Sequence, residues 1–213
     1  MKEEKSFTEV KEIDKIKALG FLFSTYREDL NYIENFYKFK ENGKTQKEYH
    51  LKSDEFNKKY TFRDFLNAYR ITRRINNDNE NINDKVKILL SETKEWVDSK
   101  DSNNVDFFAH KLKEKNITRG IEISLSSKIL FLNNPVNVFP IDTRVRKYFD
   151  LKDNVYSDYI EKVESYKRDY YKEIDVYLKN FEKCFEAIEI NFTFINIQEI
   201  RINRFLDKLF WSP

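Results

Sequence analysis

Apolar side chains recur every three or four positions along nearly the whole chain, which is the spacing of one face of an α-helix. The stripe is longest over residues 157–188, where it predicts a single amphipathic helix, and a last helix is predicted over residues 202–210. Residues 188–194 alternate between apolar and polar side chains, which favours a short extended segment. Because a helix and its connection use about 20–25 residues, the pattern predicts an all-α bundle of about eight helices.

The composition sets limits on how this bundle is stabilised. The 213 residues fit one helical domain over residues 1–213, built as one large domain or as two small lobes that share a core. Cys184 is the only cysteine, so neither an intramolecular disulfide nor a cysteine-based zinc site is expected. The two histidines, His50 and His110, lie far apart in the sequence, and we therefore expect no metal centre.

Charge and hydropathy give expectations about location and partners. No apolar run approaches the roughly 18 residues that cross a bilayer, and no apolar signal core follows the first five residues. We therefore expect a cytoplasmic protein with no membrane association. The net charge is only +2, so any affinity for nucleic acid must come from local basic clusters. Two such clusters are present, one at Arg70, Arg73 and Arg74 and the other at Arg144, Arg146 and Lys147.

The segment over residues 124–147 is the most informative for chemistry. A short apolar helix is predicted from Ser124 to Leu132, with Lys128 within it, and a turn follows. Pro140 favours an extended conformation at Phe139, so Asp142 falls where the next helix would begin. Lys128 and Asp142 are 14 residues apart, and a helix of about two turns with a return loop could bring both to one cleft.

Two motifs in this segment resemble a known family. The run Pro140-Ile141-Asp142-Thr143-Arg144-Val145 resembles the Pro-Val-Asp-Thr-His-Val signature of the helix-hairpin-helix DNA glycosylases. Residues 124–128 sit where that family has its Gly-x-Gly-x-Lys hairpin, and residues 201–211 look like the last helix of small 8-oxoguanine-glycosylase-fold proteins. The resemblance extends in part over residues 60–213 and implies two lobes with a cleft. It also implies a catalytic role for Asp142 and, as in the bifunctional members, for Lys128.

The departures from the family pattern change what is expected at the hairpin. Both glycine positions read as serines, Ser124 and Ser126, and Gly120 is the only glycine nearby. Either the hairpin would then be distorted, or the hydroxyls of Ser124, Ser126 and Ser127 would contact a DNA phosphate where the family uses backbone N–H groups. The metal ion of the family hairpin is not expected. Arg144 replaces the histidine of the signature, and would pair with a phosphate or with an acidic neighbour.

The resemblance implies a DNA glycosylase, or a glycosylase with lyase activity, that serves in DNA repair or phage defence. Its partner would be double-stranded DNA with the target base flipped into an aromatic pocket, and no cofactor would be needed. A carboxylate beside C1′ stabilises the positive charge that develops on the sugar, which would be the role of Asp142. A lysine that is neutral part of the time can attack C1′ and form a Schiff base, which would be the role of Lys128. Arg144, Arg146 and Lys147 would contact phosphates next to Asp142.

Plainer interpretations stand beside this one. Asp142 could be only a helix N-cap, and Lys128 a solvated lysine. The basic clusters could be solvated faces. Two further classes of function follow from these interpretations: a catalytically inactive DNA-binding module with the same fold, and a helical interaction protein in which the motif is a coincidence.

Overall fold

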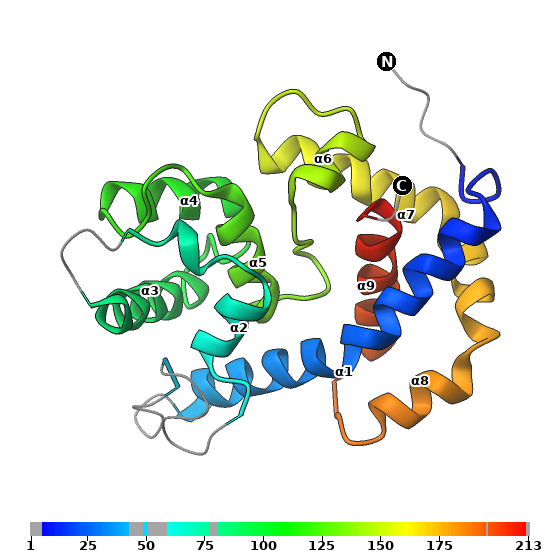
Figure 1. Ribbon diagram of the computed structural model, residues 1–213, viewed down its shortest axis with the longest axis horizontal. Coiled ribbons are helices and arrows are strands. Elements are labelled where there is room, and N and C mark those ends of the chain that lie inside the picture. Colours follow the sequence, from blue (N-terminus) through cyan, green and yellow to red (C-terminus); the bar gives the residue numbers. More distant parts are fainter. Residues whose placement is uncertain (1–5, 43–48, 51–58, 77–80, 195, 212–213) are drawn as a thin grey trace. The chain divides into compact units, whose positions relative to one another are not determined.

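A computed structural model confirms the all-α prediction (Figure 1). It describes residues 6–42, 49–50, 59–76, 81–194 and 196–211, and these contain helices but no β-strand. The α-helices are α1 (Glu12–Asn42), α2 (Phe62–Ala68), α3 (Ile82–Val97), α4 (Val105–Glu114), α5 (Ile123–Asn133), α6 (Thr143–Tyr148), α7 (Tyr156–Lys179), α8 (Glu182–Glu189) and α9 (Ile197–Trp211). Along these described segments, no helix combines the length and the apolarity that crossing a membrane requires.

The chain forms two compact units. Unit 1 consists of residues 1–30 together with residues 139–213, and unit 2 consists of residues 31–138. Helix α1 contributes its first part to unit 1 and its last part to unit 2. Unit 1 is therefore assembled from two stretches that are distant in the sequence, whereas unit 2 is continuous.

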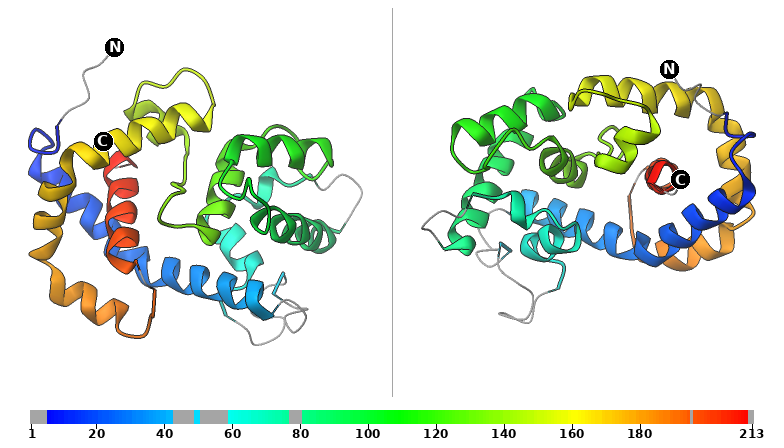
Figure 2. Two further views of the ribbon diagram at one scale, coloured as in Figure 1. Left: turned by 180° about the vertical axis from the view of Figure 1, so that it is seen from behind. Right: turned by 45° about the horizontal axis from the view of Figure 1, so that its top comes forward.

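Helix α9 is the central element of unit 1. Both views of Figure 2 place it among the first part of α1, α7 and α8. Every residue from Ile200 to Phe210 is buried except Lys208, so α9 is buried on all sides and not only along one stripe. A helix in this position needs partners for its polar side chains as well as its apolar ones.

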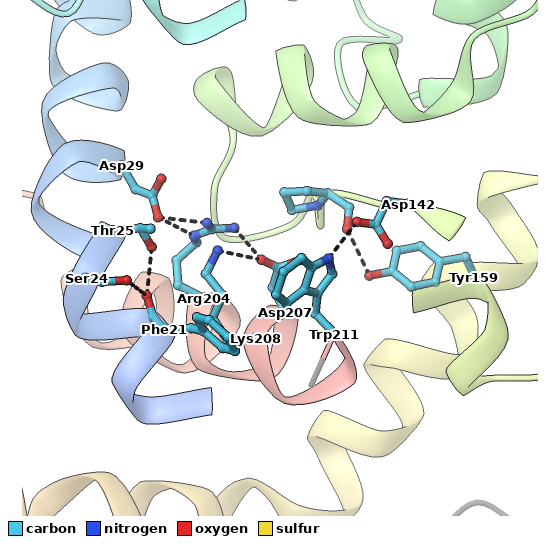
Figure 3. Close-up of polar contacts among 11 residues, drawn as sticks. Phe21, Ser24, Thr25, Asp29, Asp142, Tyr159, Arg204, Asp207, Lys208 and Trp211 are labelled. Atoms are coloured by element: carbon cyan, nitrogen blue, oxygen red, sulfur yellow. Dashed lines mark hydrogen bonds and ion pairs between the residues drawn. The ribbon is translucent and has the colours of Figure 1, made fainter. Parts of the chain in front are cut away.

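Two buried arginines supply the polar contacts of α9. Arg204 is 1% exposed and donates to the carboxylate of Asp29 on α1, through Nε at 2.9 Å and Nη2 at 2.7 Å. Its Nη1 donates to Asp207 at 2.9 Å (Figure 3). Arg201 donates to Glu189 at the end of α8, and the same carboxylate accepts the hydroxyl of Tyr26. These ion pairs join α9 to α1 and α8.

Unit 2 is organised around α5, which packs against α3 and α4. Its apolar residues are almost completely buried: Ile123, Leu125, Ile129, Leu130, Phe131 and Leu132. Residues 115–122 connect α4 to α5, and within them Thr118 forms an isolated antiparallel bridge with Ile75. The bridge fixes this connection beside the short 3₁₀ helix Thr72–Arg74.

Two sequence predictions about helix limits are wrong. The single helix expected over residues 157–188 is interrupted: α7 ends at Lys179 and α8 begins at Glu182. At the interruption the side-chain amide of Asn180 donates to the backbone oxygen of Tyr177, a local bond that competes with continued helix. Within the extended segment expected over residues 188–194, residues 188–189 belong to α8, residues 190–191 form a turn, and residues 192–194 pair with no strand among the described residues.

Candidate functional site

Two tyrosines at the start of α7 hold the segment that leads to Asp142. The hydroxyl of Tyr156 accepts the backbone N–H of Phe139 at 2.8 Å and donates to the backbone oxygen of the same residue at 3.1 Å. The hydroxyl of Tyr159 donates to the backbone oxygen of Pro140 at 3.3 Å. Since both tyrosines are buried, they fix the backbone immediately before Asp142 against the core of unit 1.

The hydroxyl of Tyr159 stays protonated over the whole physiological range of pH. Burial, with the charges of Asp207 and Asp142 adding to it, raises the pKa of Tyr159 well above its usual value. A protonated hydroxyl is the form that can donate to Pro140, so this anchor does not depend on pH in the physiological range.

Asp142 is the N-cap of α6, as the sequence predicts. Its backbone is extended, with φ −140° and ψ −176°, while the helix begins at Thr143. One carboxylate oxygen, Oδ1, accepts the backbone N–H of Arg144 at 2.8 Å and that of Val145 at 3.1 Å. The N-cap interpretation is therefore confirmed, and it leaves the second oxygen for another contact.

That second oxygen, Oδ2, accepts the indole N–H of Trp211 at 3.0 Å. Trp211 is the last residue of α9, and Figure 3 shows its ring directed at the Asp142 carboxylate. Three N–H groups thus hold a carboxylate that is only partly buried. A carboxylate held in this way has one orientation and still reaches the surface.

The ring of Trp211 is itself enclosed by two side chains. Phe21 of α1 meets it edge-on, with ring centroids 5.3 Å apart and planes at 90°. The guanidinium of Arg144 lies over the ring, with Cζ 4.0 Å from its centroid. Among the described residues, the guanidinium of Arg144 contacts this ring and forms no ion pair with an acidic side chain, so the acidic partner that the sequence offers is not the one it takes.

The basic side chains after Asp142 point outward on α6. Arg144 and Lys147 are exposed and Arg146 is half-buried. Where the structure describes their surroundings, none of the three forms an ion pair with an acidic side chain. Their positive charge is therefore available to an anion from outside. The guanidinium of Arg144 is stacked on the indole of Trp211, and a guanidinium stacked in this way keeps its N–H groups at the edge of the stack, where they can still donate.

The serines of the predicted hairpin lie inside the short helix that the apolar pattern predicts and not at a turn. Ser124, Ser126 and Ser127 are inside α5, and the side chains of Ser126 and Ser127 are completely buried. Ser127 donates back to the oxygen of Ser124 at 3.3 Å, the local bond typical of serine inside a helix. The turn between the helices is the connection 115–122, which contains Gly120, so the hairpin assignment to residues 124–128 is wrong.

Lys128 lies in α5 and is half-buried between Ser127 and Ile129. It belongs to unit 2, whereas Asp142 belongs to unit 1. Because the two residues belong to different units, the expectation that Lys128 and Asp142 meet in one cleft stays a prediction.

Sequence reasoning missed three residues that position Asp142. It placed Trp211 only within the segment that looks like the last helix, and it did not select Tyr156 or Tyr159. A signal was present for the tyrosines, because they are three residues apart on the buried face at the start of α7. No sequence signal connects Trp211 to a carboxylate 69 residues away.

Comparison with protein-family models, with curated proteins and with solved structures finds no match for this chain. Within the described residues, no three side chains of His, Cys, Asp or Glu gather closely enough to hold a metal ion. The function must therefore be argued from the site alone.

Proposed function

We propose that the protein is a DNA glycosylase, or a glycosylase with lyase activity, acting on a damaged or modified base in double-stranded DNA. The observation that carries the proposal is the Asp142 carboxylate, which is partly exposed and oriented by three N–H groups. It follows a Pro-Ile step and precedes the basic side chains of α6, as in the glycosylase signature it resembles. The direct test is release of a modified base from a duplex, with Asp142→Asn as the comparison.

The chemistry needs a carboxylate of this kind. When an N-glycosidic bond breaks, the base leaves with the bonding electron pair and takes up a proton, and positive charge develops at C1′. A fixed negative charge beside C1′ stabilises that state, because it is in place before the reaction and needs no reorganisation. If water is the nucleophile, its oxygen bonds to C1′ and its proton passes to the carboxylate or to solvent.

Lys128 decides between two forms of the reaction. If its amine attacks C1′, nitrogen bonds to carbon as the base leaves, and opening of the sugar ring gives an imine. Borohydride reduces an imine to an amine, so it would trap a covalent protein–DNA adduct. We expect Lys128→Gln to abolish this adduct, whereas the exposed Lys87 of α3, replaced in the same way, should leave it unchanged.

The measurement is the amount of adduct on a denaturing gel after incubation with a modified duplex and borohydride. Undiminished adduct with Lys128→Gln would remove this residue from the mechanism. Base release without any adduct in the wild-type protein would instead assign the attack to water.

The basic residues of α6 predict a salt effect. Replacing Arg144 and Arg146 together with alanine should weaken binding to any duplex about equally. It should also reduce the slope of log affinity against log salt by about two units, roughly one for each lost phosphate contact. The matched control is the pair Lys172 and Lys183, two exposed cations of unit 1 that lie on α7 and α8 and outside both basic clusters. An unchanged slope in the first variant would place the DNA elsewhere.

A catalytically inactive DNA-binding protein is the second candidate. The observation that favours it is that Asp142 has a complete structural role, as N-cap of α6 and as acceptor for Trp211. The complete burial of Ser126 and Ser127 also leaves no side chain of the predicted hairpin serines at the surface except Ser124. Binding to modified duplexes without release of any base would support this candidate.

A further inference from the structure

We infer that Trp211 is a positioning residue, and that Oδ2 of Asp142 is the oxygen that faces the reacting sugar. The inference rests on the proposed function and deepens it, because it separates the roles of the two carboxylate oxygens. Its basis is the single bond from the indole of Trp211 to Oδ2, at 3.0 Å.

Oδ1 has no remaining capacity for a substrate. A carboxylate oxygen offers about two lone-pair positions. On Oδ1 both are taken by the backbone N–H groups of Arg144 and Val145. Both donors belong to the first turn of α6, so they stay in place as long as that helix exists. Oδ2 accepts only one hydrogen bond among the described residues and keeps a lone pair for a nearby positive centre.

The orientation of Oδ2 depends on Trp211. Rotation of an aspartate carboxylate about its last side-chain bond is broad and soft, and two bonds to one oxygen restrict it only in part. The bond to Trp211 fixes the other oxygen and so defines the plane of the carboxylate. An indole N–H can only donate, so its partner in this geometry must be an acceptor.

Trp211 is rigid enough for this role although it ends a helix. Phe21 packs against the ring edge-on, and the guanidinium of Arg144 covers it at 4.0 Å. The neighbouring residue Phe210 is buried and makes aromatic contacts with Tyr148, Phe149 and Tyr166. The end of α9 is thereby held against α6 and α7, and the indole with it.

The kinetic test is Trp211→Phe, which keeps an aromatic ring and removes the N–H. We expect kcat for base release to fall about ten- to a hundredfold, the factor that corresponds to losing one hydrogen bond to a charged group. KM should change little, because the bond acts on the chemical step. The matched control is Trp96→Phe in α3 of unit 2, which removes an indole N–H that has no described hydrogen-bond partner. An unchanged kcat in Trp211→Phe, or a rise in KM alone, would overturn the positioning role.

The spectroscopic test does not require activity. The chain has two tryptophans, so a nitrogen-15 spectrum contains two indole N–H resonances, and the two Trp→Phe variants assign them. The Trp211 resonance should lie downfield, as for an N–H bonded to a carboxylate, and should move upfield in Asp142→Ala. The Trp96 resonance should stay in place. A Trp211 resonance that does not respond to Asp142→Ala would contradict the bond itself.

Base release tests the proposed function, whereas the indole resonance of Trp211 tests its contact with Asp142. If the wild-type protein releases no base, the proposed function fails, and with it the catalytic meaning of Trp211. A Trp211 resonance that responds to Asp142→Ala would still establish the contact between the two side chains in that case.

Discussion

Replacing Asp142 with asparagine is expected to lower the rate of base release at least about a hundredfold, the scale of effect seen when one charge-stabilising group is removed from an active site. An asparagine has one oxygen and one N–H₂ group, so it removes the negative charge from the site. It can accept either the N-cap bonds of α6 or the indole N–H of Trp211, but not both. We therefore expect a folded protein that is less stable by about 1 kcal/mol.

The measurement is single-turnover release of the modified base, with DNA affinity and thermal unfolding recorded for the same preparations. The matched control is Asp158→Asn, which changes an exposed acid in the first turn of α7, also in unit 1. The control should release base at the wild-type rate. Full activity in a folded Asp142→Asn protein would exclude this carboxylate from the reaction.

Arg204→Met is expected to cause the largest loss of stability, about 3–5 kcal/mol. Arg204 is 1% exposed, and its guanidinium is shared by Asp29 and Asp207. Methionine fills much of the same space but leaves the buried carboxylate of Asp29 without this cation. Asp207 keeps a second cation in Lys208, at 3.5 Å, so most of the cost falls on Asp29. Urea unfolding of both proteins measures the difference.

Two further variants show whether the buried charge of Asp29 causes the loss of stability in Arg204→Met. Lys94→Met removes an exposed ion pair with Asp98 on α3 and should change stability by no more than about 0.5 kcal/mol. Arg204→Met combined with Asp29→Leu should recover much of the loss, because the buried carboxylate that has lost the Arg204 cation is then gone. A double variant as unstable as Arg204→Met alone would assign the effect to lost packing.

The helical character was predictable from the spacing of apolar residues, because that spacing is local. The N-cap at Asp142 was also predictable, because Pro140 and the apolar positions that follow Asp142 define the start of a helix within a few residues. The interruption at Asn180 was not predictable, because the apolar stripe continues across it. The helix α7 ends there through backbone bonds from Asn180 and Phe181 to the residues three positions earlier, together with the side-chain bond from Asn180 to Tyr177. The start of α9 at Ile197, five residues before the predicted helix, was also missed.

The bond between Trp211 and Asp142 and the buried pair of Arg204 and Asp29 are long-range and therefore left no local signal. Nothing near Arg204 in the sequence indicates Asp29, and nothing near Asp142 indicates Trp211. The hairpin was misplaced for a different reason. Ser126 and Ser127 are small enough to be buried where α5 packs on its neighbours, and sequence alone does not separate a buried serine from one at a turn.

The proposal that the protein excises a base is tested by measuring base release from a panel of duplexes, each with one modified base. Free base is detected by mass spectrometry and strand scission on a gel, for the wild-type protein and for Asp142→Asn prepared in parallel. We expect that the wild-type protein releases at least one modified base and that Asp142→Asn releases it at least about a hundredfold more slowly. No release from any duplex by folded wild-type protein, or equal release by both proteins, would contradict it.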